Sequence, residues 1–160
     1  MHILIPDAQF QGPADIESAA APGLEFTAFH GVPQSAIPAA AWEQADAIVC
    51  YHEVTLDHAW LERLPRLRTI VRAGVGFDNV DLAAAGALGI PVCNVPDYGT
   101  TDVADHAIAT MMTLTRGVAS YDRLLRADPR GNWRFDAPPA ILRLRGRRFG
   151  VVGLGRIGTA

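Results

Sequence analysis

The sequence predicts an α/β protein: a parallel sheet with helices, continued by one long helix and a glycine-rich turn. Short apolar runs alternate with helix-like pieces over the first hundred residues. Apolar residues then recur at three- and four-residue steps over residues 101–127, and a Gly-x-Gly-x-x-Gly pattern follows an apolar run near the end. With 160 residues, 49% of them hydrophobic and 19% charged, the chain can bury a core of ordinary globular size.

The first hundred residues contain five strand-like runs separated by four helix-like pieces. The runs are short and apolar and predict strands at residues 2–6, 24–29, 46–51, 68–73 and 90–95. Helices are predicted at residues 14–21, 39–45, 56–64 and 79–88, the last of them capped by Asp78 and Asp81. Strands that alternate with helices form βαβ units, so we expect a parallel sheet with helices on both faces.

The apolar spacing over residues 101–127 predicts one amphipathic helix, which at 1.5 Å per residue is about 40 Å long. Helices of that length often connect domains. We therefore predict a first domain at residues 1–98 and a second part at residues 99–160. The proline-rich residues 128–139 are predicted to be a loop and residues 148–152 a strand.

All 14 basic side chains are arginine, which excludes lysine chemistry such as a Schiff base or a P-loop lysine. They are unevenly placed, because residues 1–62 hold none of them and residues 116–160 hold ten. No aromatic stripe or nucleic-acid motif accompanies them. We expect an exposed face, a surface that packs on something acidic, or a small-anion site there, rather than a nucleic-acid partner.

Other classes of site and location are also excluded by composition. The five histidines and two cysteines show no metal-ligand spacing, so no metal is expected. Cys50 and Cys93 lie inside apolar runs and are predicted to be buried thiols of a cytoplasmic protein. No run of about 18 apolar residues and no signal peptide is visible, so no membrane partner is expected.

The glycine motif near the end predicts a dinucleotide site. After the predicted strand at residues 148–152, Gly153 would allow a tight turn, Gly155 would let the backbone approach a pyrophosphate, and Gly158 would let a helix pack close to the strand. The alternative is a glycine-rich turn within an α/β sheet. The chain continues only to Ala160, so the acidic residue that separates NAD from NADP is not in it.

Several segments in order resemble the D-isomer-specific 2-hydroxyacid dehydrogenases, over nearly the whole chain. They are residues 51–56 (YHEVTL), 68–81 (RTIVRAGVGFDNVD), 88–96 (LGIPVCNVP), 102–107 (DVADHA) and 153–158 (GLGRIG). Within that family the resemblance is to the branch that contains phosphoglycerate dehydrogenase and the C-terminal-binding protein corepressors. It implies a flavodoxin-like substrate domain followed by a truncated start of a Rossmann cofactor domain.

The resemblance also implies which residues form the site. Substrate-binding residues would be His52, Gly74, Val75 and Gly76, with the turn presenting its backbone N–H groups to a substrate carboxylate. Cofactor-binding residues for NAD, with NADP not excluded, would be Val75, Val103, Gly153, Leu154, Gly155, Arg156, Ile157 and Gly158. Arg72, beside the turn, is either a structural ion-pair partner or a substrate contact. The family's catalytic arginine, glutamate and histidine lie beyond the glycine motif, so no catalytic residue is assigned in this chain.

The function implied is an NAD(P)-dependent oxidoreductase that moves a hydride between nicotinamide and the 2-carbon of a small D-2-hydroxy or 2-oxo acid. A homodimer is implied as well. Because the catalytic set is not in these residues, the chain is expected to be an incomplete and inactive portion of such an enzyme. The alternative is a dinucleotide-sensing, corepressor-like regulatory protein on the same fold.

Overall fold

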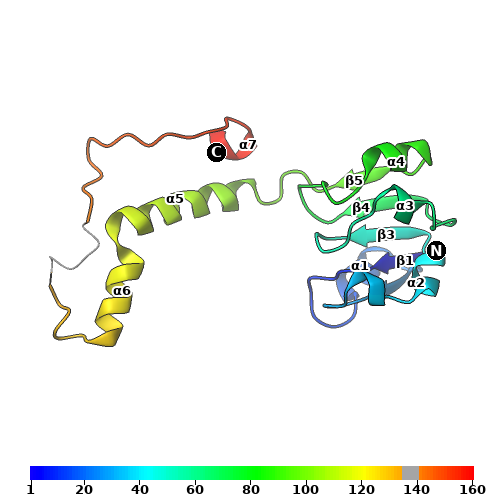
Figure 1. Cartoon of the computed structure of the whole chain (residues 1–160), viewed down its shortest axis with the longest axis horizontal. Helices are drawn as coiled ribbons and strands as arrows, with labels where there is room; N and C mark the ends of the chain where they lie inside the picture. The colour runs from blue at the N-terminus through cyan, green and yellow to red at the C-terminus, as the bar shows by residue number, and fades with distance from the viewer. Residues whose placement is uncertain (135–140) are drawn as a thin grey trace. The chain divides into compact units, whose positions relative to one another are not determined.

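The computed structural model describes residues 1–134 and 141–160, which form two compact units at Met1–Tyr98 and Gly99–Ala160. The first unit is a five-stranded sheet in which every neighbouring pair is parallel (Figure 1). The strands are β1 (His2–Ile5), β2 (Glu25–Ala28), β3 (Ala47–Cys50), β4 (Thr69–Arg72) and β5 (Val92–Asn94). Their spatial order, β2-β1-β3-β4-β5, is the flavodoxin-like order, which confirms the predicted fold class.

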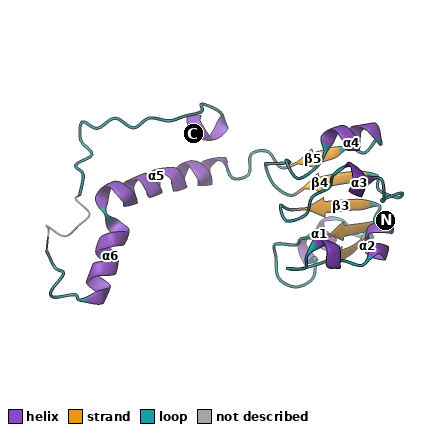
Figure 2. Ribbon diagram, viewed as in Figure 1, coloured by secondary structure: helices purple, strands orange, loops and turns teal. Residues whose placement is uncertain are grey.

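Four helices and one short 3-10 helix connect these strands (Figure 2). They are α1 (Asp15–Ala20), η1 (Gln34–Ala36), α2 (Ala39–Glu43), α3 (His58–Leu61) and α4 (Leu82–Ala87). The last two begin later than predicted because Asp57 and Asp81 are their N-caps, each accepting a backbone N–H three residues on. Asp81 therefore caps α4 as expected, whereas Asp78 does not.

The main core lies on one face of the sheet, between the strands and helices α2 to α4. Leu4, Ile48 and Ile70 come from neighbouring strands at matching register and are fully buried there. A smaller cluster on the opposite face contains Ile5 and Ala14, the residue directly before α1. Both cysteines are free, but only Cys50 is buried. The prediction for Cys93 is wrong, because on β5 its side chain is exposed.

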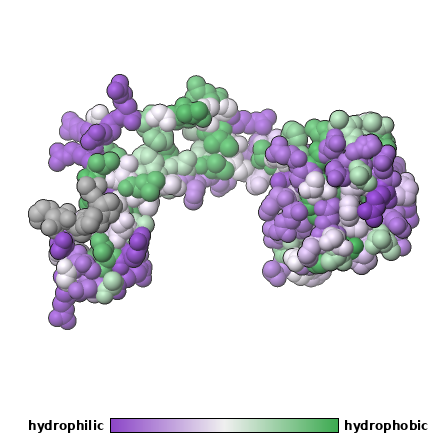
Figure 3. All heavy atoms as spheres, in the orientation of Figure 1, coloured by the Kyte–Doolittle hydropathy of each residue, from purple (hydrophilic) through white to green (hydrophobic). Residues whose placement is uncertain are grey.

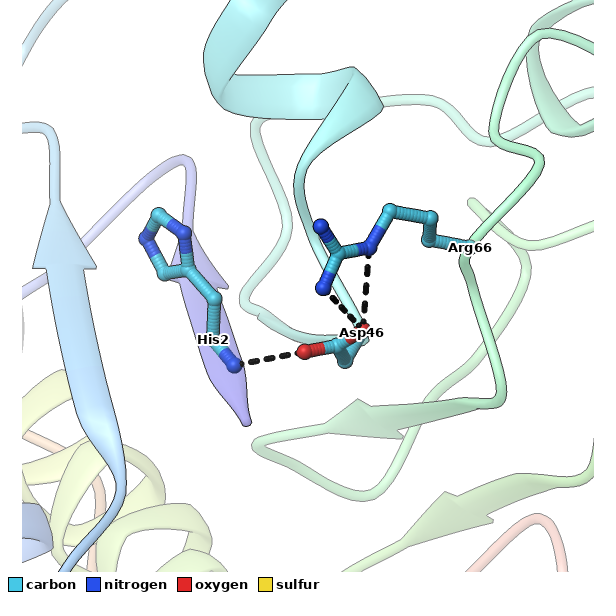
Figure 4. A network of polar contacts seen from close by, with 3 residues as sticks. All are labelled: His2, Asp46 and Arg66. Carbon is cyan, nitrogen blue, oxygen red and sulfur yellow. Dashed lines mark hydrogen bonds and ion pairs between the residues drawn. The ribbon is translucent and has the colours of Figure 1, made fainter.

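A polar network holds the amino end of the sheet together (Figure 4). The Asp46 carboxylate accepts the backbone N–H of His2 at 2.8 Å and a guanidinium N–H of Arg66 at 2.9 Å. These interactions join the start of β1 to the segment before β4. The His2 N–H and the Arg66 guanidinium lower the pKa of Asp46 below its ordinary value of 3.8.

The second unit contains α5 (Thr100–Arg116), α6 (Val118–Ala127) and α7 (Arg156–Thr159). The prediction of one helix over residues 101–127 is wrong, because Gly117 adopts φ 64° and ends α5 in a left-handed turn. Gly117 lies between the apolar positions Leu114 and Val118, so the apolar spacing continues across it and does not reveal the interruption.

The predicted strand at residues 148–152 is also not formed. A parallel strand needs a neighbour to take its hydrogen bonds, and the described part of the second unit contains no strand. Of the predicted loop at residues 128–139, the described part, 128–134, holds turns without helix or strand, and the rest lies outside the described residues. No helix among those described is both long and apolar enough to cross a membrane.

The Asp46 network predicts a pH-dependent contribution to stability. Its carboxylate has a lowered pKa in the folded state, so the stabilisation is present above the unfolded-state pKa and is lost as the pH falls through the folded-state value. We expect Asp46→Asn to lower the urea midpoint at pH 7, and the difference from wild type to shrink as the pH falls below 3.8. A difference that stays constant across this range would contradict the assignment.

Candidate functional site

The carboxyl ends of β3 and β4 bring the predicted substrate-binding residues to one edge of the sheet. Cys50 and Arg72 are direct partners in the parallel ladder. His52 lies two residues beyond the first, and Gly74 lies two residues beyond the second. Ligands of open parallel sheets bind beyond this edge of the strands.

The turn at residues 74–76 is fixed by β5 and the residue after it. The side-chain amide of Asn94 donates to the Val75 carbonyl at 2.8 Å, and the Val95 N–H donates to the Gly74 carbonyl at 3.0 Å. The Gly74 N–H is used locally, since it donates to the Arg72 carbonyl at 2.8 Å. Within the described residues the N–H groups of Val75 and Gly76 have no protein acceptor, so these are the donors available to a ligand.

Arg72 lies against this turn. A side-chain carbon added at Gly74 would collide with Nη1 of the Arg72 guanidinium. The Arg72 Nε is buried and has no hydrogen-bond partner in the described part of the chain, where no carboxylate pairs with the guanidinium either. Arg72 is expected to be either an ion-pair partner or a substrate contact. Among the described residues it forms no ion pair.

The loop that carries His52 is held by two side chains that the sequence did not single out. Asp7, two residues beyond the end of β1, accepts backbone N–H groups of the loop, and Asn79 donates to carbonyl groups of the loop. The His52 side chain itself is exposed. The only sequence signal for Asp7 is its place after a buried strand end, and for Asn79 its place shortly after the glycine turn.

Cys50 is not a nucleophile at neutral pH. Burial, with a smaller contribution from the negative charge of Asp7, raises the pKa of its thiol to about 12, and the positive charge of Arg72 only partly opposes this. A thiol with this pKa stays protonated. Among the described residues, no group of three or more histidine, cysteine or acidic side chains is placed to hold a metal ion.

The glycine motif lies in the second unit, and its three glycines differ in backbone conformation and in the space around them. Gly153 has φ 96°, a conformation that L-residues with side chains rarely adopt. A side-chain carbon at Gly158 would collide with the Gly153 carbonyl oxygen, so this position requires glycine for packing. At Gly155 such a carbon would meet nothing within 4 Å. Among the described residues, no contact requires glycine at position 155.

The other predicted cofactor residues are close to this turn in sequence or belong to a helix that contacts it. Leu154 is exposed, Arg156 and Ile157 open α7, and Val103 lies in the first turn of α5. Helices α5 and α7 are in contact. The two sets of predicted residues thus belong to separate units, and Val75 and the substrate residues are in the first.

Comparison with known proteins places these features in one family. The model for the D-isomer specific 2-hydroxyacid dehydrogenase catalytic domain matches residues 4–121. The D-3-phosphoglycerate dehydrogenase of Mycobacterium leprae is 40% identical over 119 residues, which are 74% of this chain and 22% of that protein. The chain thus spans about a fifth of the length of such a relative.

Solved structures extend the match over almost the whole chain. D-lactate dehydrogenase from Aquifex aeolicus, complexed with NAD and lactic acid, has a TM-score of 0.84 and 26% identity, covering 98% of this chain and 46% of that one. An NADPH-dependent glyoxylate/hydroxypyruvate reductase from Sinorhizobium meliloti, in complex with NADP and malonate, has a TM-score of 0.74 and 31% identity, covering 99% and 47%. The chain belongs to the D-isomer-specific 2-hydroxyacid dehydrogenase family, as its sequence motifs indicated.

Proposed function

We propose that this chain supplies the substrate-binding domain and the first part of the cofactor site of an NAD(P)-dependent D-2-hydroxyacid dehydrogenase. The observation that carries the proposal is a combination at one sheet edge. Among the described residues, the N–H groups of Val75 and Gly76 have no acceptor, and the buried Nε of the Arg72 guanidinium has no partner. N–H donors and a guanidinium suit a carboxylate. The solved relatives named above were crystallised with small carboxylates, lactic acid and malonate.

The substrate would be a small 2-hydroxy or 2-oxo acid held by its carboxylate. The N–H groups of Val75 and Gly76 would donate to the carboxylate oxygens, and Arg72 would balance the negative charge. Burial of the Arg72 Nε reduces screening by water, so that a carboxylate gains more from the guanidinium there than at an exposed site. His52, at the same edge, would contact the substrate from the neighbouring loop.

The glycine turn in the second unit fits the pyrophosphate of NAD or NADP. Gly155 leaves the space, while Gly153 and Gly158 fix the turn in a shape that only glycine permits. Leu154, Arg156, Ile157 and Val103 would complete this side of the site. When bound, the nicotinamide supplies or accepts the hydride at the 2-carbon of the acid.

We expect the residues that exchange the proton during this reaction to lie outside the residues of this chain. The resemblance places the family's arginine, glutamate and histidine beyond the glycine motif. The chain is therefore expected to bind its ligands without turning them over. A protein of full family length that binds dinucleotide but reduces none of glyoxylate, hydroxypyruvate and pyruvate would favour the regulatory alternative.

The second unit also supports a homodimer as the assembled form. Figure 3 shows hydrophobic side chains at the surface along α5. Ile108 and Met112 lie one turn apart on this helix, and 49% and 42% of their surfaces are exposed. In the described residues neither α5 nor α6 buries a side chain fully. Apolar helix faces of this kind gain stability when a second surface covers them.

The substrate site predicts where a small dicarboxylate binds. In a proton–nitrogen NMR titration of the chain with oxalate, the amide resonances of Val75 and Gly76 should shift. Arg72→Ala should weaken oxalate binding about tenfold or more, because a charged hydrogen-bond donor is lost. Arg63→Ala is the matched control, since Arg63 lies over the Trp60 ring and not at this edge.

Unmoved resonances at Val75 and Gly76, or equal weakening by Arg63→Ala, would show that the substrate does not bind here. The wild-type chain should oxidise NADH in the presence of glyoxylate, hydroxypyruvate or pyruvate no faster than a blank without protein. A measurable rate would contradict the assignment of the proton-transfer residues to positions outside the chain.

The glycine motif predicts opposite consequences for two alanine substitutions. Gly158→Ala should disturb the amide resonances of residues 153–158 and cost about 1–3 kcal/mol of local stability through overpacking against Gly153. Gly155→Ala should leave these resonances close to wild type and weaken NAD binding, because the added methyl group fills the open space. Wild-type NAD affinity in Gly155→Ala would rule out the proposed approach of the pyrophosphate.

The homodimer predicts a sedimentation mass of twice 17.2 kDa for the wild-type chain. Met112→Asp should shift the protein towards the monomer mass, because it places a charge on the exposed apolar face of α5. Thr110→Asp is the control, on an exposed position that faces another direction of the same helix. A monomeric wild type, or equal dissociation in both variants, would contradict a dimer formed through this face.

A further inference from the structure

Residues 51–54, which connect the end of β3 to the following segment, are held mainly through their backbone. The Oδ1 atom of Asp7 accepts the Tyr51 N–H at 2.8 Å. The Oδ2 atom accepts the Glu53 N–H at 2.8 Å and the Val54 N–H at 3.4 Å. The Asp7 carboxylate, which follows β1, thus accepts hydrogen bonds from three N–H groups of this loop.

Asn79 holds the same loop through its carbonyl groups. Its side-chain amide donates to the Tyr51 carbonyl at 3.1 Å and to the Val54 carbonyl at 2.8 Å. The Asn79 backbone is tied in as well, because its carbonyl accepts the Leu56 N–H at 2.8 Å. Asn79 comes three residues after Gly76, so it links the His52 loop to the segment that follows the glycine turn.

The contacts flank His52 and leave it free. In the described part of the chain, the His52 N–H has no protein acceptor and the exposed imidazole makes no hydrogen bond or ion pair. The peptide groups on either side are fixed, while the residue between them is turned outward. The backbone position of His52 is therefore fixed by its neighbours, while its side chain stays free to meet a ligand.

Asp7 is buried, so its carboxylate needs the hydrogen bonds that the His52 loop donates to it. Asp7 is the buried charged residue of the first unit, with 2% of its surface exposed. A buried carboxylate is stable only when hydrogen bonds replace the water it has lost. Among the described residues, all the donors to that carboxylate come from the His52 loop, so the loop and the carboxylate depend on each other.

We infer that Asp7 and Asn79 are positioning residues of the proposed substrate site, and the inference rests on that proposed function. They fix the His52 loop relative to the turn at residues 74–76. Neither touches the substrate. Loss of either contact lets His52 move away from the carboxylate held by Val75 and Gly76, so substrate affinity falls even where the fold persists.

The test compares oxalate affinity in Asn79→Ser with that in a control variant that also removes a side-chain hydrogen bond to the backbone. Asn79→Ser removes both donors without adding charge. Asp81→Ala is the control, because it removes a side-chain acceptor of the Ala84 N–H at the start of α4 and does not touch the His52 loop. Oxalate binding is followed through the Val75 and Gly76 amides and the His52 ring resonances, and melting temperatures are measured for each protein.

We expect Asn79→Ser to raise the oxalate Kd about tenfold and to abolish the His52 ring shift, while Asp81→Ala stays within about twofold of wild type. Wild-type affinity in Asn79→Ser, or equal weakening in Asp81→Ala, overturns the positioning role and leaves the proposed function standing. Absence of any shift in the wild-type chain overturns the proposed function itself.

A measurement on the wild-type chain covers the case in which Asn79→Ser does not fold. Backbone hydrogen exchange should be slow at Tyr51, Glu53 and Val54 and fast at His52, because only the first three N–H groups have acceptors. Equally fast exchange at all four positions would show that the loop is not held, and would overturn the inference.

Discussion

The parallel pairing of β3 with its neighbours β1 and β4 is the constraint on which the first unit depends. Parallel strands cannot be joined by tight turns, so each connection crosses the sheet as a loop and helix. All the loops that follow the strands therefore gather at one edge. The register that pairs Cys50 with Arg72 sets His52 and Gly74 at corresponding positions on that edge. Short motifs far apart in sequence become neighbours through this pairing alone.

The two edges of the sheet use charged side chains in different ways. At the amino edge, Asp46 is paired with Arg66 and with the His2 N–H, and these charges are satisfied within the protein. At the carboxyl edge, the described residues leave the Arg72 guanidinium without a carboxylate. Asp7, also at this edge, is satisfied by backbone N–H groups and not by a cation. The positive charge of Arg72 is thus not balanced by a carboxylate in the described part of the chain, which is why we propose it as a contact for an anionic ligand.

Local patterns in the sequence predict the strands and helices of the first unit, because hydrophobic periodicity and capping act over a few residues. They fail where a conformation depends on distant partners. The contacts of Asp7 join residues more than forty positions apart, so no spacing in the sequence announces them. The apolar run at residues 148–152 looks like a strand but has no strand beside it. Gly117 breaks a helix whose apolar spacing continues on both sides.

The two units differ in how many side chains they bury. The first unit buries whole side chains on both faces of its sheet, so the carboxyl edge of the sheet is supported by the core beneath it. The second unit presents Val103, Leu114 and Trp133 to solvent, and isolated helices of 17 and 10 residues are marginal in water. The stability of these helices therefore depends on tertiary contacts more than on their own hydrogen bonds. The proposed anion site at the sheet edge uses residues of the first unit alone, so it depends on the folding of that unit and not on the helices of the second.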